Sequence, residues 1–337
     1  MKNQLKKAVM SRRSAVLVGA MAALALAATT GCGGNTSPTA QGSSDGTTKI
    51  TLVSSITGSS FLAVTAGIEQ GIFQKHGVEI DLIKVKSSAE AAAAVASGQA
   101  DIAAMVPEGV VAVVAAGSQM KMVGNLLHQV QHRLEVPESI KTAKDLAGKK
   151  VGVVGPGNGS EILAKAYLAE NGVDLSQVTF VATGPQPAQL AALTSGQIQG
   201  AMLVPPYDLK AETAGMHPLS ILREDFQDIP AQVFASSDRS LKTNGETVKK
   251  FMAAATESAQ WVVDHPDEAT KILASDAQIS PEDAKASYDR AKDAYSLDGA
   301  ISNQGLTKWL ELSQKYAQLA KIPNIADVYD AQYLPGK

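Results

Sequence analysis

The chain has 337 residues, of which 45% are hydrophobic and 4% are aromatic, and its formal net charge at pH 7 is −3. The first 31 residues carry five Lys and Arg side chains and no acidic one, so the rest of the chain is more acidic than the whole. This balance argues against nucleic acid and anionic membrane surfaces as partners. So few aromatic residues also disfavour an aromatic cage for a quaternary ammonium ligand.

Residues 1–31 have the features of a secretory signal peptide. A basic segment precedes an apolar run, residues 15–28, that is too short to cross a bilayer. Cys32 follows small residues, an arrangement that resembles a bacterial lipoprotein signal, and it is the only cysteine. An intramolecular disulfide and a cysteine-based metal site are therefore excluded. We expect a lipid on Cys32, a flexible tether over residues 32–48, and a location in the cell envelope, on the periplasmic or extracellular face.

A repeated stretch predicts two similar lobes. Ser97–Glu108 and Ser195–Pro206 both read Ser-Gly-Gln, six residues, then Val-Pro, and each follows a run of small residues. Such a stretch predicts a helix that ends at glycine, then a buried strand that stops at proline. Loops beyond the carboxyl ends of strands in open α/β sheets are where ligands bind. We therefore expect both Val-Pro loops to face one cleft.

The first predicted strand, residues 49–53, leads into the hydroxyl-rich loop Ser54–Ser60 and a helix that begins at Phe61. This order of elements presents free N–H groups to an anion or a ligand oxygen. The alternative is that the hydroxyl groups only cap the helix. The candidate ligand contacts in this lobe are Ser54, Ser55, Thr57, Gly58, Ser59, Phe61, Pro107 and Glu108.

The segment after a predicted strand at residues 120–127 is expected to connect the lobes. It contains His128 and His132, whose spacing suits a metal site only on a helix. In an extended segment the two would lie about 13 Å apart and could not share a metal. We therefore expect no metal site and no cofactor.

The second lobe is predicted to begin with a strand at residues 150–154 and the glycine-rich loop 155–160. The glycine spacing fits neither a dinucleotide-binding fingerprint nor a P-loop. The loop either lets backbone N–H groups approach a small ligand or is a simple tight turn into the next helix. The candidate contacts in this lobe are Gly157, Asn158, Gly159, Ser160, Pro205 and Tyr207.

The remaining chain is predicted to be helical, and its apolar spacing is typical of helices that pack on a core. The expected helices cover residues 246–265, 267–275, 281–292 and 304–320. We expect all of them to cover the first lobe. The predicted organisation is then residues 49–135 with 235–337 as the first lobe and residues 136–234 as the second.

Four segments together resemble the substrate-binding lipoproteins of ATP-driven importers, in the branch for nitrate, taurine, aliphatic sulfonates and pyrimidine precursors of thiamine. They are GIFQKHGVEIDL, SGQADIA, SIKTAKDLAGKKVGV and LTSGQIQGAML. The resemblance implies a two-lobed α/β fold of the periplasmic-binding-protein type II class, in which each lobe is a mainly parallel sheet flanked by helices. It further implies two crossing connections, a cleft that closes on one ligand, and docking onto a permease and its ATPase.

The resemblance favours capture of a small solute over catalysis, by a monomer that contacts the membrane only through its lipid. The predicted loops carry no Arg or Lys, so an anion such as a sulfonate, taurine or nitrate would be held by N–H groups and hydroxyls. A neutral heterocycle stacked on Phe61 or Tyr207 is the alternative, and Glu108 could accept from an amine. An enzyme or a ligand sensor on the same fold also remains open, although no Ser-His-Asp spacing or carboxylate pair stands out.

Overall fold

The computed structural model describes residues 47–317, 319 and 321–337. The predicted signal peptide, Cys32 and the tether up to residue 46 lie outside these residues. No helix within the described residues is long and apolar enough to cross a membrane.

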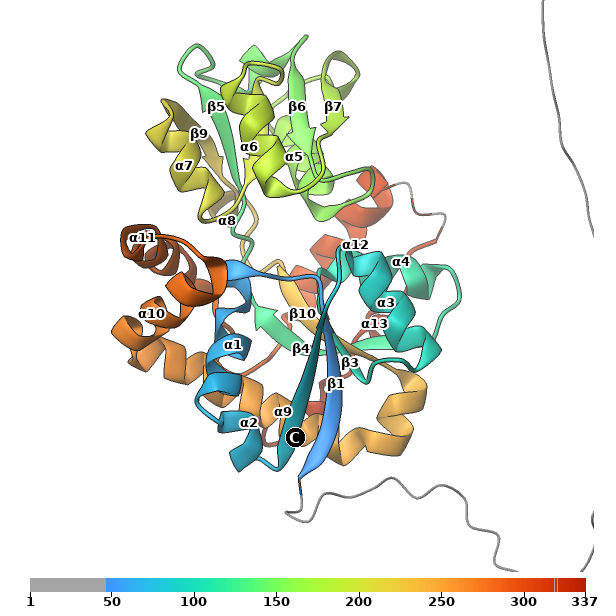
Figure 1. Ribbon diagram of the computed structural model, residues 1–337. Helices are drawn as coiled ribbons and strands as arrows, with labels where there is room; N and C mark the ends of the chain where they lie inside the picture. Colours follow the sequence, from blue (N-terminus) through green and yellow to red (C-terminus); the bar gives the residue numbers. More distant parts are fainter. Residues whose placement is uncertain (1–46, 318, 320) are drawn as a thin grey trace, which may run out of the picture. The chain divides into compact units, whose positions relative to one another are not determined.

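The first of two five-stranded sheets is built from the segments that precede and follow the strands of the second sheet in the chain (Figure 1). Its strands are β1 (Thr48–Ser54), β2 (Val78–Lys84), β3 (Ile102–Met105), β4 (Met120–Leu127) and β10 (Gln232–Ser237). The spatial order is β2-β1-β3-β10-β4. Strands β1, β2 and β3 are parallel, whereas β10 runs antiparallel to both of its neighbours.

The second sheet repeats this pattern with the middle of the chain. Its strands are β5 (Arg133–Pro137), β6 (Lys150–Val153), β7 (Thr179–Ala182), β8 (Gly200–Leu203) and β9 (Met216–Ile221). The order is β7-β6-β8-β5-β9, with β6 parallel to β7 and β8 and with β5 antiparallel to β8 and β9. Strands β3 and β8, from the two copies of the repeat, are both central. Each sheet also takes one antiparallel strand that enters after the chain has crossed over.

The chain passes between the sheets twice, through residues 128–132 after β4 and through residues 226–231 before β10. This topology confirms the predicted α/β class with two mainly parallel sheets. The longer helices are α1 (Leu62–Glu69), α3 (Ser88–Ser97), α4 (Pro107–Ala115), α5 (Gly159–Glu170), α6 (Gln186–Thr194), α9 (Asp238–Asp264), α10 (Pro266–Ala277), α11 (Pro281–Ala291) and α12 (Asn303–Ala317). The shorter helices are α2 (Ile72–Lys75), α7 (Tyr207–Thr213), α8 (Leu222–Asp225) and α13 (Ile325–Val328).

Local sequence explains where the helix α3 begins and ends. The Ser87 side chain accepts a hydrogen bond from the Glu90 N–H at 3.2 Å, which satisfies a backbone donor that the first turn leaves free. At the other end, Gly98 has a φ of 79°, a left-handed conformation that glycine adopts without strain. The strand β3 then starts four residues later and is buried throughout. The repeat therefore folds as its pattern predicts.

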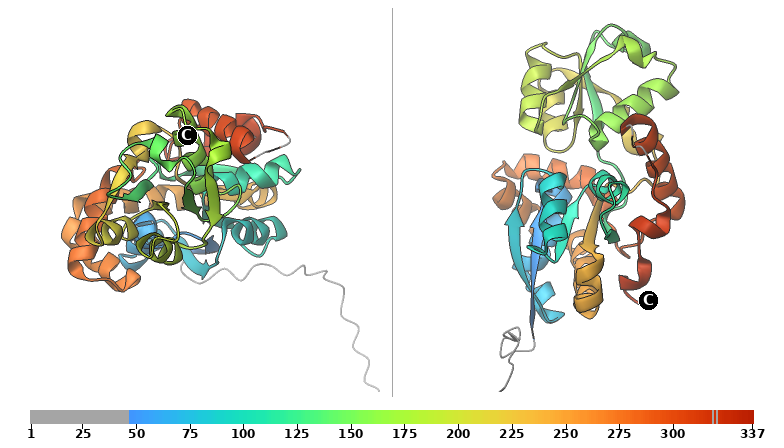
Figure 2. Two further views of the ribbon diagram at one scale, coloured as in Figure 1. Left: turned by 90° about the horizontal axis from the view of Figure 1, so that it is seen from above. Right: turned by 90° about the vertical axis from the view of Figure 1, so that its right-hand side faces the viewer.

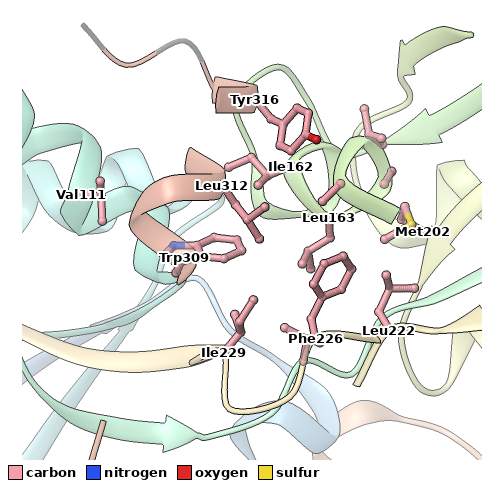
Figure 3. Packing of buried hydrophobic residues seen from close by; sticks show 14 of the residues in the cluster. Val111, Ile162, Leu163, Met202, Leu222, Phe226, Ile229, Trp309, Leu312 and Tyr316 are labelled. Carbon is pink, nitrogen blue, oxygen red and sulfur yellow. The ribbon is translucent and has the colours of Figure 1, made fainter. Parts of the chain in front are cut away.

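Helix α12 differs from the prediction that every C-terminal helix covers the first lobe. It packs against α5, a helix of the second sheet, as the right-hand view of Figure 2 also shows. Figure 3 shows Trp309, Leu312 and Tyr316 of α12 beside Ile162 and Leu163 of α5. The apolar face of α12 was recognisable in the sequence, but the surface that it covers was not, because burial of an apolar face is non-directional.

The second crossing segment also packs under α12. Phe226 and Ile229 are buried in the same cluster as Trp309 (Figure 3). Gly305 of α12 lies so close to this segment that a Cβ atom there would be 1.7 Å from the Asp228 carbonyl oxygen. Glycine is thus required by the close approach of two backbones. Helix α12 therefore links α5 to one of the two connections between the sheets.

Candidate functional site

Both Val-Pro corners lead into contacts between the two halves of the fold. Glu108 follows the first corner, in the first turn of α4, and its Oε1 accepts hydrogen bonds from Gly159 N–H at 2.7 Å and Asn158 Nδ2 at 3.2 Å. Asp208 follows the second corner, in α7, and its carboxylate pairs with Arg290 of α11. Loops of one half therefore meet elements of the other at both corners, as the repeat predicts.

The backbone N–H groups of the glycine-rich loop in the second half already have hydrogen-bond acceptors within the protein. The Gly157 N–H donates to Glu161 Oε2 at 2.7 Å, the Asn158 N–H to a loop carbonyl, and the Ser160 N–H to Asn158 Oδ1 at 3.0 Å. The Ser160 hydroxyl is fully buried and bonds to Asn158 Oδ1 and to the Val154 N–H. Since Glu108 takes the Gly159 N–H, the N–H groups of residues 157–160 are all engaged. The loop has the hydrogen bonding of a tight turn, which was the alternative to ligand binding.

The hydroxyl-rich loop of the first half keeps more of its groups available. Ser54 is fully buried and its hydroxyl bonds within the loop to Ile56. The Ser55 hydroxyl lies 3.3 Å from that of Ser88 in α3. Thr57 is exposed and makes no side-chain cap on the 3₁₀-helix η1 (Gly58–Phe61) that it precedes. Ser54 is thus a structural residue, and the candidate contacts of this loop shift toward its end.

Two serines at that end of the loop differ in how their hydroxyl groups are used. The Ser60 hydroxyl donates to Gln131 Oε1 at 2.8 Å, and Gln131 belongs to the first crossing segment. Ser59 is 1% exposed, and its hydroxyl finds no hydrogen-bond partner among the described residues. A buried hydroxyl without a partner is uncommon and calls for an explanation.

Phe61 does not have the position expected of a ring that stacks on a ligand. It is fully buried in the apolar core of the first half, and the Lys84 ammonium lies 4.1 Å from its ring centroid. Phe61 is therefore removed from the candidate ligand contacts. Tyr207 is half-buried at the start of α7, with Lys210 over its ring at 5.7 Å. Pro107 and Pro205 are both buried at their corners.

Sequence reasoning missed a cluster of charged side chains beside Pro205. Arg133 of β5 contacts Glu135 Oε1 at 3.4 Å through Nε and Glu212 Oε1 at 3.2 Å through Nη2. Arg290 of α11 contacts Asp208 at 2.5 Å and Glu212 Oε2 at 2.6 Å. The alternation of Arg133 and Glu135 in a strand was a visible signal that both face one side. Nothing local indicated that Arg290 would join them.

Burial changes the acid–base behaviour of two carboxylates at these contacts. Glu135 is fully buried, and burial together with the nearby Glu212 charge raises its pKa to about 8. Burial raises the pKa of Glu108 to about 7, against the opposing effect of the Gly159 N–H. Burial lowers the pKa of His132 to about 4, so its ring is neutral at pH 7. In the described part of the chain, no group of three or more His, Cys, Asp and Glu residues could hold a metal.

Comparison with known proteins places this fold in a recognised group. The family model described as NMT1/THI5-like matches residues 59–269. The search of curated proteins found no match. Among solved structures, the chain is similar to the periplasmic aliphatic sulphonate-binding protein of Escherichia coli, with a TM-score of 0.73 and 16% identity over 86% of this chain and 94% of that one.

Two further structures have the same fold. The alkanesulfonate-binding protein of Xanthomonas axonopodis pv. citri, bound to MOPS, gives a TM-score of 0.72 and 17% identity over 84% of this chain and 98% of that one. The periplasmic nitrate-binding protein of Synechocystis PCC 6803 gives a TM-score of 0.60 and 14% identity over 70% of this chain and 69% of that one. At these identities the likeness establishes the fold. With the family match, it confirms the resemblance inferred from the sequence, and the chain belongs to the NMT1/THI5-like family.

Proposed function

We propose that this protein is the extracytoplasmic solute-binding component of an ABC importer. It captures a small anionic solute, such as a sulfonate, taurine or nitrate, in the cleft between its lobes. The lobes of this proposal are residues 49–135 with 235–337 and residues 136–234, with the correction that α12 packs on the second. A lipid on Cys32 holds the monomer at the membrane, and the closed form delivers the solute to a permease and its ATPase.

The observation that carries the proposal is the meeting of the two halves at both Val-Pro corners. The Glu108–Gly159 and Asp208–Arg290 contacts join loops at the carboxyl ends of parallel strands to the opposite half of the fold. A ligand that touches both halves favours the state in which they are close, and a partner can recognise that state. The solute classes named in the structural relatives, sulfonates and nitrate, support an anion.

Titration calorimetry against ethanesulfonate, taurine and nitrate tests this function, with small-angle scattering on the same samples. We expect saturable heat for at least one anion and a smaller radius of gyration in its presence. Mass spectrometry of solute that co-purifies with the protein identifies the native ligand. If no small solute binds or co-purifies, the protein is not a solute receptor.

An amine-bearing ligand is the second candidate, and Glu108 favours it. This carboxylate is 9% exposed and lies at the meeting of the two halves, where it could accept a hydrogen bond from an amino group. Taurine and an aminopyrimidine precursor of thiamine both carry such a group. Binding of an aminopyrimidine in the same titration, without binding of simple anions, would select this alternative.

A further inference from the structure

A small cavity lies where both halves and the first crossing segment come together. It is lined by Val130, Gln131, Arg133, Pro205, Asp208, Ile221, Arg223, Arg290 and Ala294. Its volume of about 20 Å³ is room for roughly one water-sized group. Three arginines, one glutamine and one carboxylate line this narrow space together with four apolar residues, so a polar atom placed in it lies close to charged groups.

The carboxylates at the cavity balance two of its three arginines. Arg133 pairs with Glu212, and Arg290 pairs with both Asp208 and Glu212. Arg223 of α8 donates a hydrogen bond to the Arg290 carbonyl oxygen at 3.3 Å, and it makes no ion pair with any described residue. The guanidinium of Arg223 is therefore the uncompensated charge.

The remaining carboxylate does not neutralise this charge at pH 7. Glu135 lies beside Arg133, but burial raises its pKa to about 8, so it is mostly protonated. Two carboxylates, Asp208 and Glu212, are paired with Arg133 and Arg290, so of the three guanidinium groups one is left in excess, a net charge of +1 for the paired cluster.

The cavity also has hydrogen-bond donors that are not used. Gln131 Oε1 accepts a hydrogen bond from the Ser60 hydroxyl. Gln131 Nε2 is buried and has no hydrogen-bond partner among the described residues. The Nε atom of Arg133 also makes no hydrogen bond within the described residues, although Glu135 Oε1 lies 3.4 Å from it. Buried donors without acceptors are costly, so a group that accepts from them is stabilised here.

We propose that Arg223 and the Gln131 amide bind the anionic group of the solute, at the mouth of this cavity. The inference rests on the proposed function and narrows it to a ligand with one negative charge, such as a sulfonate, a carboxylate or nitrate. One oxygen of that group fills the narrow space, and the rest of the solute extends into the cleft. A dianion is disfavoured because the cluster supplies one net positive charge. The anion is thus held by a guanidinium, in contrast to the expectation of hydroxyl and N–H groups alone.

The experiment is titration calorimetry at pH 7 with methanesulfonate, ethanesulfonate, acetate and nitrate, and with dimethyl sulfone as an uncharged counterpart. We expect Arg223→Ala and Gln131→Ala each to weaken anion binding, the former by at least about tenfold, the usual effect of losing a charged hydrogen bond. Arg239→Ala removes the same charge from an exposed site in α9 and should leave the anion affinity unchanged. Arg223→Lys keeps the positive charge and should retain most of the anion affinity.

Three outcomes overturn the inference. One is an anion affinity of Arg223→Ala within twofold of the wild type in a variant whose thermal unfolding is unchanged. A second is binding of only uncharged or cationic solutes, which would leave solute capture standing but would contradict the anionic class of solute. The third is the absence of any bound solute in titration and in mass spectrometry of the purified protein, which would end the proposed function as well.

Discussion

Removing the charge of Glu108 tests whether the contact between the two halves depends on protonation. In Glu108→Gln, the side-chain oxygen can still accept from the Gly159 N–H, which lies 2.7 Å from Glu108 Oε1. The amide cannot ionise, however. The variant therefore separates the geometry of the hydrogen bond from the cost of burying a charge.

The size of the effect follows from the pKa of Glu108. Burial raises this pKa from 4.5 to about 7, a difference that corresponds to about 3 kcal/mol. A carboxyl group whose pKa is higher in the folded state binds protons more tightly there. Its contribution to stability is therefore present at low pH and is lost as pH rises from about 4.5 through 7. Wild-type protein should lose about 3 kcal/mol through Glu108 between pH 4.5 and pH 8, whereas Glu108→Gln should not.

Urea unfolding of both proteins across this pH range measures the difference. We expect the two free energies of unfolding to be similar near pH 4.5 and that of Glu108→Gln to be higher at pH 8. Glu161→Gln is a matched control, because Glu161 caps its own loop through the Gly157 N–H within the second half. Parallel pH curves for wild type and Glu108→Gln, or a less stable variant at pH 8, would refute the reasoning.

Three further predictions concern the charged cluster and α12. Arg290→Ala leaves the fully buried Asp208 carboxylate without its partner and should lower the free energy of unfolding by about 3 kcal/mol. Gly305→Ala places a Cβ atom against the Asp228 carbonyl oxygen and should lower the melting temperature by several degrees, because two backbones must separate. Anion affinity should fall about tenfold as pH rises from 7 to 9, because ionised Glu135 cancels the net positive charge.

Each of these three predictions has a control variant. Arg239→Ala removes a charge from an exposed site, and an equal loss of stability in both arginine variants would contradict the role of the buried pair. Gln304→Ala changes the exposed neighbour of Gly305 in α12 and should be neutral. Glu135→Gln should remove the pH dependence of anion affinity, and an unchanged dependence in that variant would assign the titration to another group.

The repeat gave the most reliable structural prediction, because it depends on local patterns. The glycine at Gly98, the short buried strand and the following proline are each fixed by backbone conformation and periodicity, and β3 and β8 occupy equivalent places in their sheets. The predictions for Phe61 and α12 were less accurate, because they concern tertiary contacts that local patterns do not specify. An apolar side chain or face specifies that it will be buried, but not the surface against which it is buried.

The candidate site shows the same division. The loops that meet between the two halves could be located from the strand ends, yet the N–H groups of the loop 157–160 are bonded within its own turn and to Glu108. The charged cluster joins Arg133, Arg223 and Arg290 from β5, α8 and α11. These residues are far apart along the chain, and no local pattern distinguishes any of them from a solvent-exposed arginine on a strand or helix.

The sequence by itself determined the two repeated half-folds, the α/β class and the family, since these depend on periodicity, glycine and proline positions and short motifs. Only the tertiary structure decided which groups are free to meet a ligand. Whether a hydroxyl, an N–H group or a guanidinium already has a hydrogen-bond or ion-pair partner depends on residues that folding brings from distant segments. In this protein the N–H groups of the glycine-rich loop are bonded within the protein, so Arg223 and Gln131 are the better candidates for ligand binding.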